Sequence, residues 1–380
     1  MKCDDFDLKL FGDEHGYFVE VLSSPQGRTE PHPLTLPYDL DEQILKARTR
    51  KGDRITNAQL GVSLFAALLP PPIRNLFHVC KGQVGDTGIL RLRLDIRTDE
   101  LTRIPWEMLR DEQDYLAMSP RFPVLRYLHR AAPTPLKSIP NKIKILLVTS
   151  TPLDAAPLPG VKKELGLVCD NLRKLAASAP VEVSVLENAS FDLLRSCLDG
   201  SFNVLHFMGH GVFEDNRGYL IFEDSAHGSS WQEAESVGDV LRDKKVELLV
   251  LNACETAVSS NEKSLIGVAQ AAHAAGIPAV IAMQQAILDV AASAFSAAFY
   301  ATLTKRQPLE ACLAAGRVAT KNELGNDSTD WAIPVLFSNA PYEIPKSDAN
   351  AAEGVWIKGD VKHSIVAVQG ANSKIEQHNS

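Results

Sequence analysis

Two stretches of sequence decide the fold: Val-Leu-His-Phe-Met-Gly-His-Gly at residues 204–211, and Leu-Leu-Val-Leu-Asn-Ala-Cys-Glu-Thr at residues 248–256. Each starts with an apolar run typical of a buried parallel strand and ends in small or polar residues. The first stretch delivers His210 at its end, and the second delivers Cys254. Because ligands of an open α/β sheet bind at the carboxyl ends of the strands, we expect these two side chains to meet there.

An imidazole beside a thiol indicates nucleophilic catalysis. A free thiol has a pKa of about 8.5 and is mostly protonated at neutral pH, so it needs a neighbouring base to become a good nucleophile. We therefore interpret Cys254 as the nucleophile and His210 as the general base. The alternative is an inert buried thiol, but Glu255 and Thr256 are polar and the apolar run has already ended at Asn252.

The motifs around these two residues resemble those of a known family. Gly209-His210-Gly211 and Asn252-Ala253-Cys254 resemble the His and Cys boxes of caspase-like cysteine peptidases, the clan of caspases, separase and gingipain, and specifically of the bacterial CHAT family. The chain departs from the caspase signature, with Asn252 in place of Gln and Thr256 in place of Gly. Pro-Trp-Glu-Met-Leu at 105–109 and Gly-Ile-Pro-Ala-Val at 276–280 also resemble CHAT landmarks, so the resemblance covers roughly residues 85–340.

The resemblance implies acyl transfer to Cys254. Cys254 would attack a peptide carbonyl, and His210 would pass the proton to the leaving amine. The backbone amides of Gly211 and Cys254 would form the oxyanion hole. No third side chain of a triad is evident, and the resemblance implies a dyad whose His is held by a backbone carbonyl. No cofactor is expected.

Composition excludes several other classes of protein. The 380 residues are 45% hydrophobic and 23% charged, which is ordinary for a globular protein. The net charge of −8 and the lack of a basic block argue against direct nucleic-acid binding. No apolar run of about 18 residues predicts a membrane span, and the N-terminus does not resemble a signal peptide. Six scattered cysteines without a Cys-x-x-Cys spacing indicate a reducing, cytoplasmic location.

A second histidine, His206, precedes His210 by the spacing of a helical zinc site. No Glu follows His206, and the glycines flanking His210 break helices, so we predict no metal site and interpret His206 as a packed residue. No dinucleotide-binding, P-loop or serine-hydrolase motif occurs in the chain.

The predicted fold class is α/β. From residue 141 strands alternate with helices, which predicts a caspase-like three-layer fold over 141–344 with a six-stranded, mostly parallel sheet. We expect its strands, with the His after the third and the Cys after the fourth, at 143–148, 181–186, 204–207, 246–251, 279–283 and 331–337. A small hairpin element off the main sheet is expected around 218–222.

A smaller α/β N-terminal domain over 1–135 precedes the peptidase domain, joined to it by a proline-rich linker at 131–140. It is interpreted as a degenerate unit or a regulatory cap. Its start predicts a hairpin with a long loop at 12–16. Residues 89–96 predict a strand with one wet face carrying three charged side chains, which are Arg91, Arg93 and Asp95.

The tail at 345–380 has two strand-like runs, at 355–357 and 364–368, and is too short to bury a core alone. It is either a frayed end or a pair of docking strands for a partner.

Asp289 is the candidate for substrate specificity. It ends the loop 283–289, which in caspase-like peptidases borders the pocket for the residue before the cut. A carboxylate there would favour Arg or Lys and disfavour Asp. The alternative is that Asp289 caps the helix expected from Val290.

Three functions follow from the resemblance and the residues. The first is a cysteine endopeptidase that cleaves a partner protein in a bacterial signalling or antiviral defence system, gated by a protein activator or sensor. The second is a catalytically silent CHAT scaffold that acts by protein binding, against which the intact His210 and Cys254 argue. The third is an amidase for small substrates, which the lack of a compact substrate-clamping motif disfavours.

Overall fold

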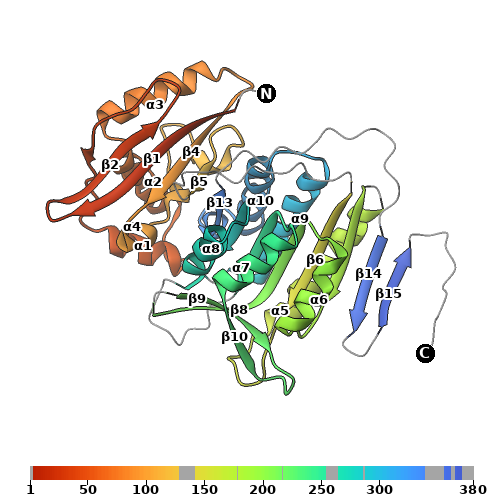
Figure 1. Ribbon diagram of the computed structural model, residues 1–380. Helices are drawn as coiled ribbons and strands as arrows, with labels where there is room; N and C mark the ends of the chain where they lie inside the picture. Colours follow the sequence, from red (N-terminus) through yellow and green to blue (C-terminus); the bar gives the residue numbers. More distant parts are fainter. Residues whose placement is uncertain are drawn as a thin grey trace. The chain divides into compact units, whose positions relative to one another are not determined.

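The computed structural model describes the ranges 3–127, 142–177, 179–215, 217–253, 264–285, 287–338, 355–360 and 364–369. Contacts divide the chain into two units. Figure 1 labels the helices and strands. Unit 1 comprises 1–134, 283–299 and 309–341, and unit 2 comprises 135–282, 300–308 and 342–380. The predicted linker at 131–140 and the nucleophile candidate Cys254 lie outside the described residues.

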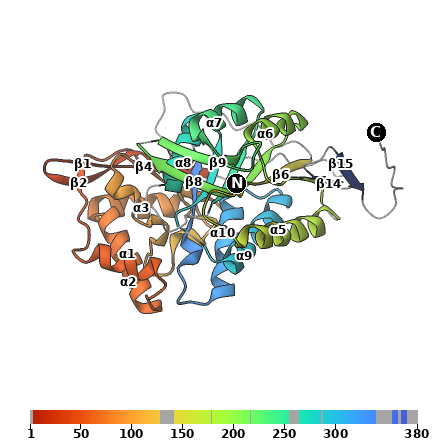
Figure 2. The ribbon, with the colours of Figure 1, turned by 90° about the horizontal axis from the view of Figure 1, so that it is seen from below.

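Unit 2 is built on a parallel sheet with the strand order β7-β6-β8-β11-β12. These strands are β6 (Ile143–Thr149), β7 (Val181–Leu186), β8 (Val204–Glu214), β11 (Leu248–Ala253) and β12 (Ala279–Met283). The helices of this unit are α5 (Gly160–Ala176), α6 (Phe191–Cys197), α7 (Ala234–Asp243) and α8 (Ser264–Ala274), with the short 3-10 turn η3 (Leu198–Gly200). Figure 2 shows α6 and α7 on one face of this sheet and α5 on the other, so the predicted α/β layering is confirmed.

The sequence explains why these elements form. The strands are nearly continuous apolar runs because both of their faces are covered. Helix α5 turns one apolar stripe to the sheet, with Val161, Leu165, Val168 and Leu172 buried. Helix α6 begins after Ser190, whose hydroxyl accepts a hydrogen bond from the backbone N–H of Leu193 at 3.2 Å.

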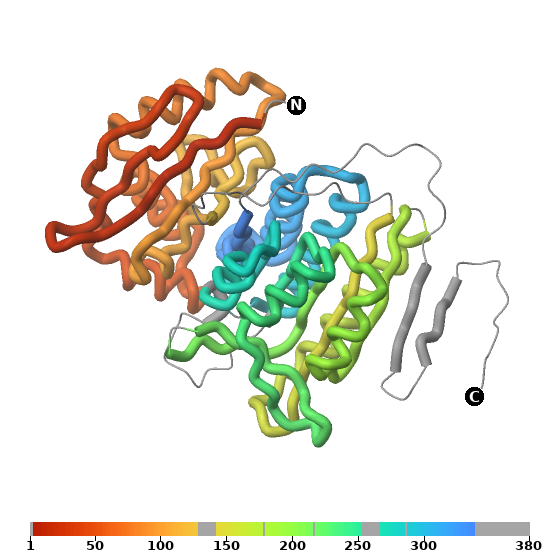
Figure 3. The backbone as a smooth tube through the Cα atoms, viewed as in Figure 1, coloured from red at the N-terminus to blue at the C-terminus, as the bar shows by residue number. Residues whose placement is uncertain are grey.

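Strand β8 is longer than predicted. It does not stop before His210 but continues to Glu214, pairing antiparallel with β9 (Arg217–Glu223), which in turn pairs with β10 (Ser229–Glu233). Figure 3 shows this path running from the sheet out along the hairpin. Gly209 suggested a strand end, but it is needed for close packing, since a Cβ there would lie 2.8 Å from the carbonyl oxygen of Ser150.

The two strand-like runs of the tail are strands. Strand β14 (Val355–Asp360) pairs parallel with β7, and β15 (Ser364–Gln369) pairs antiparallel with β14. The tail therefore extends the sheet of its own unit, at the edge that β7 would otherwise form.

The strands of unit 1 lie in the order β13-β5-β4-β1-β2-β3. Its strands are β1 (Cys3–Asp13), β2 (Gly16–Ser23), β3 (His32–Pro33), β4 (Ile89–Ile96), β5 (Val124–Arg126) and β13 (Pro334–Ser338). Its helices include α1 (Leu40–Arg48), α2 (Arg54–Leu68), α3 (Pro71–Gln83), α4 (Asp99–Thr102) and α10 (Leu309–Leu324). The short 3-10 turns are η1 (Trp106–Met108), η2 (Leu116–Met118) and η4 (Asp330–Ala332), and the division between the units falls within α9 (Asp289–Thr304).

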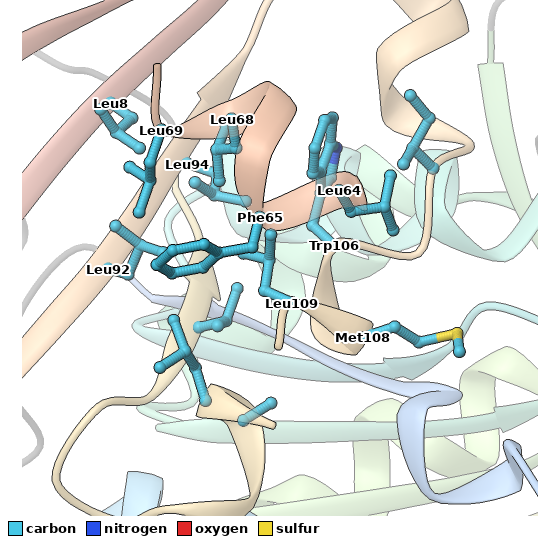
Figure 4. Packing of buried hydrophobic residues seen from close by; sticks show 14 of the residues in the cluster. Leu8, Leu64, Phe65, Leu68, Leu69, Leu92, Leu94, Trp106, Met108 and Leu109 are labelled. Atoms are coloured by element: carbon cyan, nitrogen blue, oxygen red, sulfur yellow. The ribbon is translucent and has the colours of Figure 1, made fainter. Parts of the chain in front are cut away.

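The core of unit 1 lies between β1, β4 and α2. Figure 4 shows Leu64 of α2 beside Trp106, and Phe65 of the same helix beside the strand residue Leu92. Trp106 is fully buried, and its indole N–H donates to the carbonyl of Leu101 at 2.8 Å, so this large side chain is packed without an unpaired polar atom.

Two expectations for unit 1 are wrong. The first hairpin has a tight turn instead of a long loop, because β1 and β2 stay paired up to Asp13 and Gly16. Gly16 adopts φ of 125°, a conformation that side chains rarely adopt, which allows this turn.

Strand β4 has no solvent-exposed face. Arg91 and Asp95 are each 1% exposed, because carboxylates on other elements neutralise the arginines of this strand. Arg91 donates to Asp5 at 2.6 Å, and Arg93 donates to Asp7 at 2.6 Å. These pairs lie directly opposite each other in the register of β1 and β4.

Among the helices of the described residues, none is by itself long and apolar enough to cross a membrane; the bent pair α2 and α3 meets that test when taken together.

Glu107 is the charge on which a buried cluster of unit 1 depends. Its carboxylate accepts from the Nε and an Nη of Arg126, both at 3.1 Å, and from the amide of Gln284 at 2.7 Å. Arg317 is also buried, and its guanidinium donates to two backbone carbonyls. Burial lowers the pKa of Arg317 to about 10, while the Glu107 charge opposes that shift.

We expect Glu107→Gln to destabilise unit 1 strongly. The change leaves the Arg126 guanidinium buried without its counter-charge, which typically costs about 3–5 kcal/mol in the free energy of unfolding. Chemical denaturation measures this loss. Glu42→Gln is the matched control, because the Glu42–Lys46 pair is exposed and should change stability little. Equal effects of the two changes would contradict the role given to Glu107.

Candidate active site

His210 lies where β8 passes from the parallel sheet into the hairpin. Its cross-strand partner is Ile221 of β9, and the residue before it, Gly209, is paired with Ala253 of β11. The imidazole is 6% exposed. A histidine on a strand that is bonded to its neighbours in this way has a fixed backbone position, which suits a catalytic group.

The two nitrogens of His210 have different surroundings. The carbonyl of Ala156 accepts a hydrogen bond from the imidazole, while Nε2 has no hydrogen-bond partner among the described residues. The bond to Ala156 therefore falls to Nδ1, so that Nε2 is left to act as a base. Burial lowers the pKa of His210 and outweighs the Ala156 hydrogen bond, which raises it. The imidazole is thus kept neutral and able to accept a proton at neutral pH.

The loop that supplies Ala156, residues 150–159, is attached to the β9–β10 hairpin. The hydroxyl of Ser229 donates to the Asp154 carboxylate at 2.6 Å, and the backbone N–H of Leu153 donates to the carbonyl of His227 at 2.8 Å. A third bond joins the backbone N–H of Thr151 to Glu223 at 3.1 Å. These contacts hold the carbonyl that orients His210, and no pattern in the sequence indicated them.

His206 belongs to a buried polar cluster of unit 2. The hydroxyl of Tyr300 lies 2.9 Å from Nδ1 of His206, and the Glu164 carboxylate lies 4.0 Å from Nε2. Glu164 also accepts a hydrogen bond from the side-chain amide of Asn252. Burial lowers the pKa of His206 to about 4, so it is neutral near pH 7. The prediction of a packed histidine agrees with this position.

Asn252 connects this cluster to the second motif. It lies on β11 two residues before Cys254, and its pairing partner Met208 lies two residues before His210. Cys254 itself is outside the described residues, so the structure does not show the distance between the two predicted catalytic side chains.

The structure places Asp289 as the first residue of α9, half-buried, in unit 1. The helix thus begins one residue earlier than predicted. Gln284 and Gln285 of the preceding loop line a pocket of about 30 Å³ within unit 1, together with Ile44, Arg48 and Met108, and Asp289 is not among its lining residues.

A family model for the CHAT domain matches residues 59–339. The chain belongs to the CHAT domain family. The matched range starts within α2 and ends after β13, so it includes parts of both units. No curated protein matches this CHAT protein at a significant level.

Solved structures show the same fold at low sequence identity. Saccharomyces cerevisiae separase, in its complex with securin, matches with a TM-score of 0.54 and 11% identity, over 89% of this chain. This chain spans 30% of the length of that separase chain. The Arg-specific cysteine proteinase gingipain R matches with a TM-score of 0.45 and 9% identity, over 80% of this chain and 76% of its own. The match to separase establishes the caspase-like α/β fold for this CHAT protein, in agreement with the prediction.

Within the described part of the chain, no group of three or more His, Cys, Asp and Glu side chains is arranged to hold a metal ion.

The burial of His206 predicts a dependence of stability on pH. Its pKa is about 4 in the folded state and about 6.5 when unfolded, so between these values the unfolded chain binds a proton that the folded chain does not. Stability therefore falls as the pH drops from 6.5 to 4, by up to about 3 kcal/mol from this group. His210, whose pKa is also lowered, adds to the same trend.

Denaturant unfolding at pH 7 and pH 4.5 checks this. We expect His206→Gln to lose less stability between the two pH values than the wild type does, because glutamine can still accept from Tyr300 and does not titrate. His15→Gln, at an exposed histidine, is the matched control and should behave as the wild type. A pH dependence that is unchanged in His206→Gln would contradict the assignment.

Proposed function

We propose that this CHAT protein is a cysteine endopeptidase in which Cys254 is the nucleophile and His210 the general base. The observation that carries the proposal is the register of β8 and β11. Asn252 of β11 pairs with Met208 of β8, and Ala253 pairs with Gly209. In the sequence, Cys254 follows Ala253 and His210 follows Gly209. If this register continued by one residue, Cys254 and His210 would be neighbours across the two strands.

The state of His210 supports the role of base. Its Nε2 is buried and has no hydrogen-bond partner among the described residues, and its other nitrogen is held by the Ala156 carbonyl. The Cys254 thiol would lose its proton to Nε2, attack a peptide carbonyl and form a thioester. The imidazolium would then protonate the leaving amine, and water would hydrolyse the thioester.

Strand geometry also supports Gly211 as an oxyanion donor. Backbone groups of consecutive strand residues point to opposite sides. The carbonyl of Asn203 accepts from Leu248 at the β11 side, and the carbonyl of Met208 accepts from Ser150 at the β6 side. By this alternation the amide of Gly211 lies on the side of β11, where it and the Cys254 amide would stabilise the developing charge.

The substrate and the regulation belong to the same proposal. We propose that the substrate is a protein partner in a bacterial, cytoplasmic signalling or antiviral defence system, and that a protein activator or sensor controls cleavage. An endopeptidase of this kind would damage the cell if it were always active. The alternative, a catalytically silent scaffold, does not explain why His210 has a buried Nε2 that can accept a proton.

Replacing either member of the dyad tests the proposal. Cys254→Ala and His210→Ala should each abolish cleavage of the partner protein while the protein remains folded. The double variant should be no worse than either single one, because neither group can act without the other. Cleavage is followed on gels, and folding by thermal denaturation. Full proteolysis by purified Cys254→Ala would refute the peptidase assignment.

We also propose that Asp289 favours substrates with Arg or Lys before the cut. Its place at the start of α9 fits the capping role as well, since a carboxylate is favourable at a helix N-terminus. The two roles differ in what a substitution changes.

A peptide-library cleavage profile of wild type and Asp289→Asn separates these roles. Asparagine is also a good cap, so it should preserve stability but weaken the preference for basic residues, because the charge is lost. If the wild type prefers Asp before the cut, or if the basic preference survives in Asp289→Asn, then Asp289 does not line the pocket.

A further inference from the structure

The end of β8 forms a hairpin with β9 and β10. One face of this hairpin carries His210 and, beside it, side chains that the proposed mechanism does not use. Ile221 of β9 is the cross-strand partner of His210, and Trp231 of β10 is the partner of Ile221. Directly opposite residues of paired strands point to the same face. His210, Ile221 and Trp231 therefore form one row across three strands.

A second row lies beside the first. Val212 of β8 pairs with Tyr219 of β9, and residues two apart on a strand share a face. The rings of Tyr219 and Trp231 contact each other, with centroids 5.6 Å apart and planes inclined by 59°. Ile221 is 3% exposed, whereas Trp231 is 48% exposed. The aromatic pair of Tyr219 and Trp231 is therefore accessible to solvent at the end of the row.

The opposite face of the hairpin is occupied by α8. A Cβ at Gly218, which points to that face, would lie 2.7 Å from the Cα of Val268. Phe222, on the same face as Gly218, packs on Phe207 of the sheet core with ring centroids 5.3 Å apart.

On the face with His210, the loop 150–159 contacts His210, Glu223 and Ser229, and Ile221 is buried. The part of this face that can receive a ligand is therefore the half-buried row of Val212 and Tyr219 together with the exposed Trp231.

The order of the strands shows in which direction a substrate that starts at β11 would cross the hairpin. Strand β8 lies between β6 and β11. The end of β9 lies on the side of β6 and β7. The backbone N–H of Glu223 donates to the carbonyl of Ala189, which follows β7, at 2.8 Å, and the Glu223 carboxylate accepts from Thr151, which follows β6. A path that starts at the end of β11 and passes beside the loop therefore crosses β8 at Val212, then β9 at Tyr219, and then reaches Trp231 on β10.

The chemistry of the dyad decides which half of a substrate follows that path. When Cys254 forms the thioester, the half with the carbonyl stays on the sulfur. The C–N bond breaks, and the amine of the other half takes its proton from His210. The leaving half is therefore on the His210 side, over the hairpin.

We propose that Trp231 and Tyr219 form a binding site for an apolar side chain of the substrate, in the segment that follows the scissile bond. Two strand spacings of about 4.8 Å separate His210 from Trp231, which an extended peptide covers in about three residues. The side chain bound is thus the second or third after the cut. The nearby charges of Arg217 and Glu233 are paired at 2.6 Å, so the ring surface selects for apolarity. This inference rests on the proposed peptidase function.

The test compares two substrates that share the residues before the cut. One is a coumarin amide, which has no residues after the cut. The other is an internally quenched peptide with Leu or Phe at the second and third positions after it, and the shared residues come from a peptide-library profile of the wild type. Three variants are compared with the wild type: Trp231→Ala, the conservative Trp231→Phe, and Leu193→Ala as a control at an exposed apolar residue on α6.

We expect Trp231→Ala to lower kcat/KM for the quenched peptide about tenfold, mainly through KM, and to leave cleavage of the coumarin amide within about twofold. Trp231→Phe should keep most of the activity, and Leu193→Ala should match the wild type. Replacing the apolar residues of the peptide by Gly should remove the difference between wild type and Trp231→Ala.

Two other outcomes overturn the inference in distinguishable ways. If the wild type cleaves both substrates and Trp231→Ala affects them equally or not at all, the binding site is refuted while the peptidase function stands. If the wild type, assayed together with its activator, cleaves no member of the library and no coumarin amide, the proposed function fails, and the binding site fails with it.

Discussion

Strand β8 is bonded on both edges, and the candidate site depends on that constraint. Its first half pairs in parallel with β6 and β11, and its second half pairs antiparallel with β9. His210 lies at the change from one pattern to the other. The parallel half fixes the level of His210 relative to the end of β11. The antiparallel half connects His210 to a hairpin that supports both its orienting loop and an exposed aromatic pair.

The core of unit 2 could be predicted because its signal is local. The apolar runs at β6, β7, β8, β11 and β12 are each long enough to indicate a strand, and the amphipathic helices between them indicate parallel connections. The motif around His210 was also visible in the sequence. Its orienting partner was not, because a backbone carbonyl such as that of Ala156 has no residue type and can be supplied by any loop that passes nearby.

Two errors came from taking local patterns too literally. The alternation of charged residues on β4 suggested a solvated face, but Arg91 and Arg93 meet Asp5 and Asp7, which are far away in sequence. Burial of charge depends on such partners, and one strand does not reveal them. In the same way, the glycines around His210 suggested the end of a strand. Whether a glycine ends a strand or lets two backbones approach depends on the neighbouring segment, which at Gly209 is Ser150, just after β6.

The position of His210 within a paired strand limits how far its backbone can move. Moving it would break backbone hydrogen bonds of the sheet. A change of activity must then come from what surrounds the imidazole. The loop at 150–159, by contrast, is held to the hairpin by only a few side-chain and backbone hydrogen bonds. An activator that moved this loop would change the direction of Nε2 and leave the sheet intact. Control would then act on the orientation of the His210 imidazole, while the backbone of His210 kept its position.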